Sequence, residues 1–499
     1  MEQALVLELV KRLEGRAMLS SDVSDSDLEG HDLEALTAQI LKFFEGKDSA
    51  RIVKKETLRS IIGGMASEKV PVQVEVIRKG DFEPAAKEVK SKFTIKNRKA
   101  ETVTSTTATF ADYFNDRFHK LKRFLETSSN SGMLNNIEAL KNYTNGREVT
   151  VAGIVYDKIT TRNGHVMVTL EDESGTTKVL FLKPGNPAGR QLFESAQRII
   201  FDDVLAVRGR VSSPFVIANS IAMPDLPIHE RKATEEDIAI AFLSDTHVGS
   251  RFFLEKQFAN LIRWLNGSID YRKDLAGKIK YLIVSGDVAD GIGTYPEQEK
   301  ELVTLDIFKQ YSTFFDMTNS LPDYIEMFAS PGNHDAVQAA MPQPELTKEL
   351  TGELKRNGTH VMTNPAYLNL HGLSVLASHG TSLDNVIANV PSCSYLKPET
   401  AMVEVLRRRH LAPVYGGNII VPSRNDPLVI DEVPDILHMG HVHKNGYAEY
   451  HGTLIVNSGT WQAKTDYQAK RGHLPSPGVL PVYETKTGKL TEIDFNTIG

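Results

Sequence analysis

The spacing of hydrophobic residues changes several times along the 499-residue chain, and each change predicts a different kind of structure. Residues 1–65 carry apolar residues at helical spacing in three segments, the first with Leu5, Leu9 and Leu13. They predict a small module of three packed helices or, because about 60 residues form only a modest core alone, a docking module for a partner. Residues 66–108 lose this period and become charged, then Thr/Ser-rich. They are predicted to be a linker and a candidate for disorder.

Residues 109–230 are predicted to hold a connecting helix and a β-barrel. From Gly146 the apolar period becomes two, giving three alternating strands, a helical stretch near 186–196, and two further strands. That order is typical of an OB-fold barrel. Such barrels often bind single-stranded nucleic acid through aromatic side chains and a basic groove. Since Tyr156 and Phe181 are the main aromatic candidates, a barrel that only packs on its neighbour is an equal alternative.

Residues 231–499 alternate strand and helix patterns, which predicts an α/β sandwich. Five apolar runs in this region read as buried strands, and a short polar loop follows each of them. The five loops are Asp245-Thr246-His247, Gly286-Asp287-Val288-Ala289-Asp290, Gly332-Asn333-His334-Asp335, Ser378-His379-Gly380 and Gly440-His441-Val442-His443. Open α/β sheets bind their ligands at strand ends, so the five loops predict one common site.

The residue types in these loops suit a pair of divalent metal ions. Two ions about 3.5–4 Å apart can activate one water between them and clamp the oxygens of a phosphodiester. Asp287 is the expected bridge, because a carboxylate carries charge and can span both ions. A mixed nitrogen and oxygen set favours Mn²⁺, with Fe²⁺ or Zn²⁺ as alternatives, over Mg²⁺. The other expected ligands are Asp245, His247, Asn333, His379, His441 and His443.

His334 is expected to act on the substrate, because its neighbour Asn333 is an expected ligand. We interpret it as the group that protonates the leaving oxygen or stabilises the transition-state charge. Asp290 is expected to hold the His334 ring, as carboxylates commonly orient catalytic imidazoles. Asp335 has either a supporting or a purely structural role. His438 is interpreted as a hydrogen-bonded residue outside the ligand set. Each motif occurs alone by chance, but five in order favour a real site.

Composition narrows the class of protein. A hydrophobic content of 41% with 24% charged residues is ordinary for a globular protein. The net charge of −7 differs from the basic surplus of a protein that grips nucleic acid alone. The single cysteine excludes an internal disulfide and a Cys-rich zinc site. Without a signal peptide or an apolar stretch of roughly 18 residues, the chain is expected to be cytoplasmic, with no membrane partner.

The five motifs together resemble the calcineurin-like metallophosphoesterase superfamily, whose members include protein phosphatases, nucleotide phosphodiesterases and DNA exonucleases. An OB-fold ahead of such a domain is similar to the B-subunits of replicative DNA polymerases. Four segments closely resemble the small-subunit family of archaeal family-D DNA polymerases (DNA polymerase II). They are FADYFNDRFHKLKRFL, KPETAMVEVLRRRHLAPVYGG, DPLVIDEVPDILHMGHVHKNG and VNSGTWQAKTDYQ.

The resemblance implies a 3′→5′ exonuclease that proofreads primer 3′ ends for a large catalytic polymerase subunit, its partner in a heterodimer. Other replication factors are further candidate partners of the N-terminal helices. By family analogy, one metal is held by Asp245, His247, Asp287 and His443, and the other by Asp287, Asn333, His379 and His441. The chain shows no recognisable polymerase carboxylate set, so synthesis would belong to the partner.

Two alternatives stay open. A catalytically silent scaffold subunit, like eukaryotic relatives that have lost metal ligands, is the first. A phosphomonoesterase or cyclic-nucleotide phosphodiesterase is the second. The densest basic cluster is interpreted as a contact for the nucleic-acid backbone or the large subunit, or else as a solvated helix face; it comprises Arg407, Arg408, Arg409 and His410.

Overall fold

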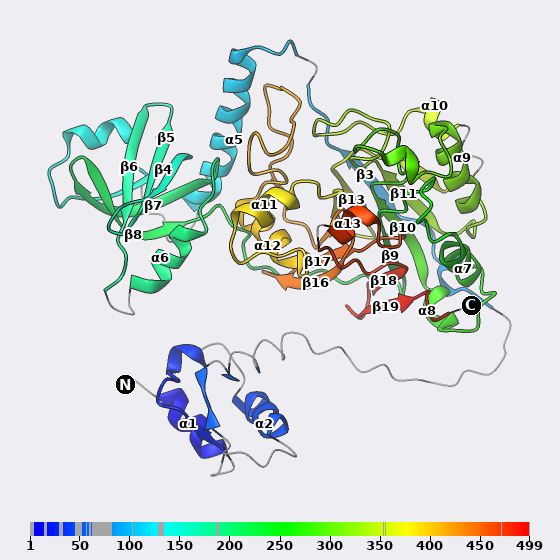
Figure 1. The fold of residues 1–499 in the computed structure, drawn as a ribbon, viewed down its shortest axis with the longest axis horizontal. Helices are drawn as coiled ribbons and strands as arrows, with labels where there is room; N and C mark the ends of the chain where they lie inside the picture. The colour runs from blue at the N-terminus through cyan, green and yellow to red at the C-terminus, as the bar shows by residue number, and fades with distance from the viewer. Residues whose placement is uncertain are drawn as a thin grey trace. The chain divides into compact units, whose positions relative to one another are not determined.

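The structure of the chain is a computed structural model (Figure 1). It describes residues 4–13, 17–28, 33–44, 52–55, 57–58, 61, 82–101, 103–127, 134–185, 189–352, 354, 356–470 and 472–498. The chain divides into two compact units, Met1–Gly80 and Asp81–Gly499. Within the described ranges, no helix combines the length and the apolar character that a bilayer-crossing segment needs.

The first unit is built on two amphipathic helices, α1 (Ala4–Leu13) and α2 (Leu33–Phe43). A short parallel pair, β1 (Met18–Leu19) and β2 (Ile52–Val53), lies with them. The core comprises the apolar residues that the helical spacing selected, including Leu9, Leu13, Leu36 and Ile40. Two of the three predicted helices are therefore confirmed. The third predicted segment falls largely on residues outside the described ranges.

The predicted linker is wrong where the structure describes it. Helix α4 (Ala85–Glu88) is followed by β3 (Phe93–Asn97), which pairs antiparallel with β13 (Ala366–Leu370). Phe93 and Ile95 pack against the core of the second unit, while Thr94 and Lys96 point to solvent. The strand was missed because it is short, lies in a charged stretch, and pairs with a partner far along the chain. Residues 66–81 of the predicted linker lie outside the described residues.

The barrel region follows the predicted element order. After α5 (Thr107–Thr127) and a 3-10 turn (Ile137–Asn142), five strands close into a barrel in the order β4-β5-β6-β8-β7. The elements are β4 (Glu148–Thr160), β5 (Val166–Asp172), β6 (Gly175–Phe181), α6 (Arg190–Gln197), β7 (Val204–Ser212) and β8 (Phe215–Ala222). Phe181 is fully buried in the barrel core and cannot stack on a strand, whereas Tyr156 is 68% exposed.

Two six-stranded sheets form the second part of this unit. The first sheet has the order β12-β11-β10-β9-β18-β19, with β9 (Ala239–Leu243), β10 (Ile279–Ser285), β11 (Glu326–Ser330), β12 (Thr359–Val361), β18 (Val479–Glu484) and β19 (Leu490–Asp494). The second has the order β16-β17-β15-β14-β13-β3, with β14 (Leu373–Ala377), β15 (Ile436–Met439), β16 (Asn445–Tyr450) and β17 (Thr453–Ser458).

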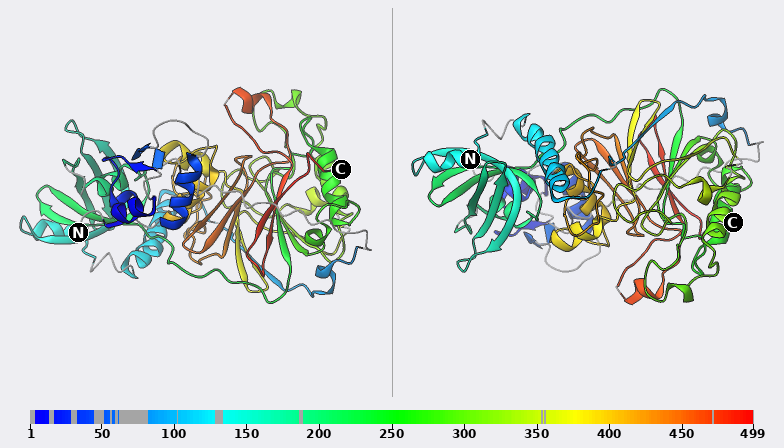
Figure 2. Two further views of the ribbon diagram at one scale, coloured as in Figure 1. Left: turned by 90° about the horizontal axis from the view of Figure 1, so that it is seen from below. Right: turned by 90° about the horizontal axis from the view of Figure 1, so that it is seen from above.

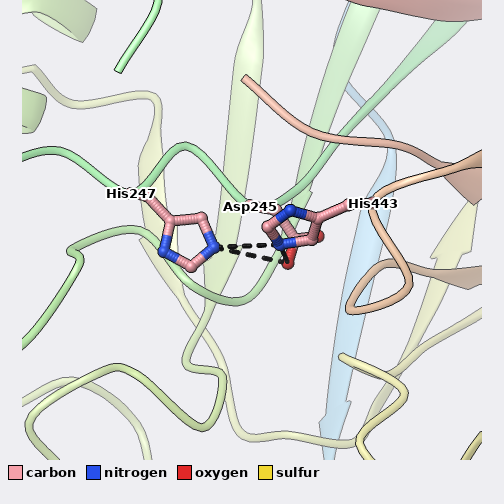
Figure 3. Close-up of side chains that lie close together, drawn as sticks. All are labelled: Asp245, His247 and His443. Carbon is pink, nitrogen blue, oxygen red and sulfur yellow. Dashed lines mark hydrogen bonds and ion pairs between the residues drawn. The ribbon is translucent and has the colours of Figure 1, made fainter. Parts of the chain in front are cut away.

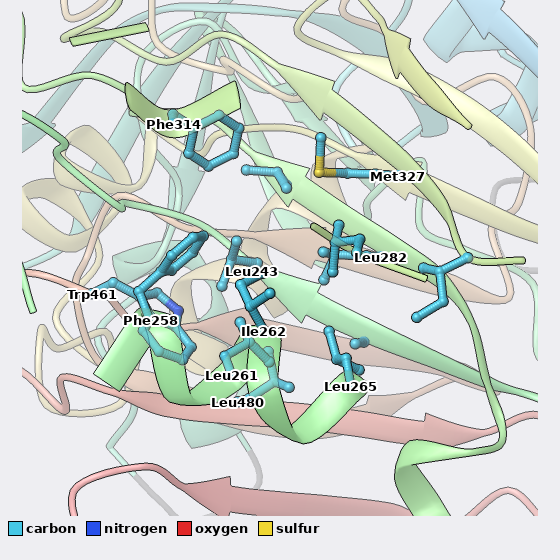
Figure 4. Close-up of a cluster of buried hydrophobic side chains, with 14 of the residues drawn as sticks. Leu243, Phe258, Leu261, Ile262, Leu265, Leu282, Phe314, Met327, Trp461 and Leu480 are labelled. Atoms are coloured by element: carbon cyan, nitrogen blue, oxygen red, sulfur yellow. The ribbon is translucent and has the colours of Figure 1, made fainter. Parts of the chain in front are cut away.

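The two sheets pack face to face, with helices on the outer faces (Figure 2). Strand β9 is apolar throughout because both of its faces are buried. Ile240 and Phe242 lie in the core between the sheets, and Ala241 and Leu243 lie in the core under the helices. Figure 4 shows this outer core, in which Leu243 belongs to one cluster with residues of helices α7 (Glu255–Leu265) and α9 (Ile307–Thr318). The helices are α7 (Glu255–Leu265), α8 (Lys273–Ala276), α9 (Ile307–Thr318), α10 (Lys348–Thr351), α11 (Leu383–Asn389), α12 (Pro398–Arg408) and α13 (Asp466–Lys470).

All five predicted buried strands form, as β9, β10, β11, β14 and β15. The first three are parallel neighbours in the first sheet, and the last two are parallel neighbours in the second. Because parallel strands end at the same edge of a sheet, this topology brings the five polar loops to one end of the sandwich.

Candidate metal centre

The polar loops meet in three groups of side chains, each with its ligand atoms within 4.8 Å of one another. One group, His247 with Asp290 and His334, combines an expected ligand with the two expected catalytic residues, and the other two consist of expected ligands alone. Asp245, His247 and His443 form the first group, shown in Figure 3. The second group has Asp287, His379 and His441 as its members. We call these six residues, with Asn333, the ligand cluster.

In the first group, three potential ligand atoms face one another. His247 Nε2 lies 3.1 Å from His443 Nε2, which lies 3.2 Å from Asp245 Oδ1. The other Asp245 oxygen accepts the His441 N–H at 2.9 Å. Oδ1 is buried and makes no well-formed hydrogen bond within the described residues. A buried carboxylate oxygen left in this state is costly, so a cation among these three atoms fits the site.

Asp287 lies between the two groups. Its Oδ2 is 3.7 Å from His247 Nε2 in the first group and 3.2 Å from His379 Nε2 in the second. His379 Nε2 is also 2.9 Å from Asn333 Oδ1. This is the position that a bridging carboxylate needs, and the bridging role itself stays a prediction.

The far sides of two imidazole rings are fixed by acceptors. His379 Nδ1 lies 2.9 Å from the carbonyl of Ser285, and His247 Nδ1 lies 2.9 Å from Asp290 Oδ1. Since a carbonyl and a carboxylate only accept, both rings carry a proton on Nδ1 and turn Nε2 toward the cluster. Metal-binding histidines are held in the same way.

Two residues that sequence analysis missed hold the other two rings. His441 Nε2 lies 3.0 Å from Asp384 Oδ2, and His443 Nδ1 lies 2.7 Å from the side-chain amide of Gln468. Asp384 is in α11 and Gln468 in α13, and neither follows a strand. No loop signal in the sequence could have selected them.

The charge balance of the cluster favours positive charge among its carboxylates. Burial alone would lower the pKa of His379, but Asp287 outweighs it and raises that pKa to about 9. Burial likewise opposes ionisation of Asp287, and the nearby imidazoles, His379 foremost, lower its pKa instead. The carboxylates therefore attract either protons on imidazole or metal cations.

Glycines in the loops permit these close approaches. A Cβ at Gly332 would overlap the Asp287 carboxylate, one at Gly286 would overlap the His379 ring, and one at Gly440 would overlap Asp245. The backbone is also unusual at five candidate ligands, which have positive φ: Asp245, His247, Asp287, His441 and His443. Non-glycine residues rarely adopt this conformation, and such residues gather at functional sites.

Asp290 holds His334, but not in the predicted way. Its main-chain carbonyl lies 2.8 Å from His334 Nδ1, whereas its carboxylate is bonded to His247 and to Gln462 Nε2 at 3.0 Å. The buried His247 Nδ1–H requires an acceptor, and the carboxylate supplies it. Thr294 Oγ1 is the second neighbour of His334 Nδ1, at 3.3 Å.

Asp335 has a supporting role. Its carboxylate accepts the N–H groups of Val288, Ala289 and Gly332 at 3.2, 3.1 and 2.7 Å, and the Tyr311 hydroxyl at 2.8 Å. It thus ties the loop after β10 to the loop after β11. His438 is buried between the hydroxyls of Ser285 and Ser458, as expected for a residue outside the ligand set.

A cleft of about 330 Å³ opens onto the cluster. Besides candidate ligands and His334, it is lined by Tyr295, Tyr395 and His473, which sequence analysis did not select.

The basic cluster on α12 is mostly internal, so its predicted contact with nucleic acid is wrong for two of the three arginines. Arg408 is 4% exposed and pairs with Asp203 of the barrel at 2.7 Å. Arg409 is 3% exposed and lies 3.5 Å above the Phe124 ring. The solvated helix face is equally wrong, because the barrel region covers this end of α12. Only Arg407 keeps partial exposure, and it pairs with Glu404.

Comparison with known proteins gives a consistent result. Residues 240–447 match the family of DNA polymerase alpha/epsilon B-subunits. The chain is 39% identical over 388 residues to the DNA polymerase II small subunit of Methanocaldococcus jannaschii, covering 76% of this chain but only 64% of that relative. It is 40% identical over 377 residues to the DNA polymerase II small subunit of Archaeoglobus fulgidus, covering 75% and 74%. The corresponding subunit of Methanothermobacter thermautotrophicus is 37% identical, with 76% and 78% covered.

Proposed function

Given that the chain belongs to the family of archaeal DNA polymerase II small subunits, we propose that it is a metal-dependent 3′→5′ DNA exonuclease that proofreads for a large catalytic subunit. We assign its barrel as an OB-fold and its sandwich as a calcineurin-like metallophosphoesterase domain.

One observation supports the proposal above all others. Five loops, from five strands in two sheets, bring an Asp, Asn and His set together around Asp287, and Asp245 Oδ1 is left without a well-formed hydrogen bond among the described residues. A purely structural cluster would satisfy that oxygen.

The ligands would divide around Asp287. Asp245, His247, Asp287 and His443 would hold one ion, and Asp287, Asn333, His379 and His441 the other. We propose Mn²⁺, with Fe²⁺ or Zn²⁺ as alternatives. When bound, such ions supply Lewis acidity, which lowers the pKa of a water nucleophile and neutralises charge on a phosphodiester.

We assign His334 as the residue that donates a proton to the leaving group. Its Nδ1–H donates to the Asp290 carbonyl, which leaves Nε2 as the ring atom for the substrate. Hydrolysis of the last linkage breaks the bond between phosphorus and the 3′ oxygen of the shortened strand. A proton delivered from His334 Nε2 makes that oxygen a neutral hydroxyl.

We assign tight DNA binding and DNA synthesis to the large subunit. A net charge of −7 suits a subunit that receives a frayed primer end from a DNA-binding large subunit in the cytoplasm. The two would form a heterodimer, with synthesis in the large subunit and hydrolysis in this chain.

The test is Mn²⁺-dependent degradation of a primer with a mismatched 3′ end, by the full chain with and without the large subunit. We expect stepwise loss of 3′ nucleotides, abolished by His334→Ala and by Asp287→Asn. His119→Ala is the matched control, because that imidazole lies exposed on α5.

The other outcomes separate the alternatives. No degradation in either setting, with metal bound and the complex intact, would establish the scaffold function. Turnover of small phosphoesters without degradation of DNA would establish the phosphomonoesterase or cyclic-nucleotide phosphodiesterase.

A further inference from the structure

Two aromatic rings stack in the wall of the cleft, and the hydrolysis proposed above uses neither. Tyr395, between α11 and α12, and His473, after α13, have ring centroids 4.6 Å apart and an interplanar angle of 27°. Both side chains are half-buried, so the stack belongs to the cleft surface rather than to the core.

The two residues are connected to different candidate ligands, Tyr395 through its side chain and His473 through its backbone. The Tyr395 hydroxyl is hydrogen-bonded to Asp384, whose Oδ2 lies 3.0 Å from His441 Nε2. On the other side, the main-chain N–H of His473 donates to the main-chain carbonyl of Gln468 at 3.0 Å, and the Gln468 side chain contacts His443. These contacts place the stack beside both His441 and His443.

The two stacked rings add flat surface to a cleft whose floor is charged. Leu396 and Leu474, the residues that follow the two rings, are 53% and 55% exposed. A third aromatic residue, Tyr295, lines the same cleft, with its ring centroid 6.1 Å from that of His334. Flat ring surface beside a floor that would hold metal cations suits a nucleotide, whose base and phosphate need different environments. A volume of about 330 Å³ is in the range of small-ligand pockets.

We propose that the Tyr395–His473 stack is a nucleobase-binding wall, on which the base of a 3′-terminal nucleotide adds a third ring while its phosphate lies at the ligand cluster. This inference rests on the proposed nuclease function and specifies its substrate: an unpaired 3′ nucleotide of a single strand. A paired terminal base must leave its helical stack before it can enter. Since every base has a flat face, the wall accepts all four bases.

Binding is tested separately from cleavage, with an oligonucleotide that carries 2-aminopurine as its 3′-terminal base and a phosphorothioate at its last linkage. Stacking quenches 2-aminopurine fluorescence. With the full chain in CaCl₂ we expect quenching at saturation. Tyr395→Ala and His473→Leu are expected to lose the quenching and to bind about tenfold or more weakly, the range measured for base–aromatic stacking. Tyr395→Phe keeps the ring and should keep the quenching.

Two controls make the binding test specific. Tyr156→Ala removes a tyrosine that is 68% exposed on the barrel, and it is expected to change nothing. Circular dichroism shows whether each variant is folded. If Tyr395→Ala does not fold, His473→Leu still tests the wall, because it removes the ring and retains apolar volume.

The second test of the wall compares the KM of the wild type with that of Tyr395→Ala. On a single-stranded 3′ end in MnCl₂, the KM of Tyr395→Ala should rise about tenfold. On the same strand with an abasic 3′-terminal residue, wild type and variant should have equal KM, because there is no base to stack.

The outcomes distinguish this inference from the proposed function. Wild-type protein that degrades no strand refutes the nuclease, and the quenching experiment still decides whether the wall binds a base. The proposed wall would be refuted if folded Tyr395→Ala and His473→Leu kept the quenching and the KM of the wild type. It would also be refuted if quenching were lost only in Tyr156→Ala.

Discussion

Two buried clusters of charged side chains lie in the same unit and differ in how their charges are balanced. In the junction cluster, which comprises Arg117, His410 and Asp426, Asp426 Oδ2 is 2.7 Å from Arg117 Nε and 2.8 Å from His410 Nε2. It links α5 to the segments after α12. Each of these three residues is 1% exposed. In the ligand cluster the burial is similar, but only imidazoles face the carboxylates.

The two clusters differ in whether their charges are fully paired within the protein; we call a fully paired cluster closed and the other open. Arg117 carries a permanent charge, and it also donates to the Pro413 carbonyl at 3.2 Å, so the junction cluster is complete in itself. In the ligand cluster, Asp245 Oδ1 makes no well-formed hydrogen bond among the described residues, and the Nε2 atoms of His247 and His379 point inward. A closed cluster stabilises a junction, whereas an open one has room for a cation. The following predictions test this contrast, beginning with the largest effect.

Opening the closed cluster should destabilise the fold. Arg117→Leu leaves the Asp426 charge buried with His410 as its remaining partner, which costs about 3–5 kcal/mol for a buried pair of this kind. Urea denaturation followed by fluorescence of the two tryptophans measures the loss. Lys96→Ala is the control, because its partner Glu432 is exposed, and it should cost less than about 1 kcal/mol. Equal losses of unfolding free energy in Arg117→Leu and Lys96→Ala would show that pairing within the junction cluster does not stabilise the fold.

Filling the open cluster should stabilise the fold. Mn²⁺ at 100 times its dissociation constant should raise the free energy of unfolding by about 2.7 kcal/mol, if the unfolded chain does not bind it. The comparison is between denaturation in Mn²⁺ and in EDTA. Asp245→Asn should lose the gain, because it removes the ligand charge at Oδ1. A gain that persists in Asp245→Asn would place the ion elsewhere.

Moving a carboxylate without removing it should impair catalysis. Gly332→Ala forces its Cβ against Asp287, and a displacement of about 1 Å at a catalytic centre can lower kcat/KM about 100-fold. Gly185→Ala is the matched control, because its Cβ would meet nothing within 4 Å. Primer degradation in MnCl₂ measures both variants. Equal rates would show that the close approach of Gly332 to Asp287 does not matter.

Acid should affect the closed cluster in a defined direction. Burial opposes ionisation of Asp426, but His410 and Arg117 outweigh it and hold the pKa of Asp426 below its usual value. The stability that this lowered pKa provides is present above about pH 4 and is lost as the pH falls further. The urea midpoint of wild type should therefore fall more steeply below pH 4 than that of Asp426→Asn. Parallel curves would contradict this assignment.

Local sequence was sufficient to predict the strands and the convergence of their loops. Each of the five strands is a continuous apolar run, because both of its faces are buried, and its loop carries residues with few structural alternatives. Parallel pairing then brings the loops together without further information. The loops also contain three glycines, and only the structure shows which side chain a Cβ at each would overlap.

Features that depend on distant partners could not be predicted. Strand β3 is defined by pairing with β13, and the burial of Arg408 is defined by Asp203 of the barrel. Neither partner is near in sequence. The same limit applies to Asp384, which is distinguished by its contacts with His441 and Tyr395 and not by its sequence neighbours.

The most direct test of the contrast is anomalous X-ray diffraction from crystals of the full chain soaked in MnCl₂. Two neighbouring peaks are predicted, one among Asp245, His247 and His443 and one among Asp287, His379 and His441. At the junction cluster no peak is expected. A ligand cluster without manganese, or with Asp287 bound to neither ion, would contradict the assignment of the open cluster as a two-metal centre.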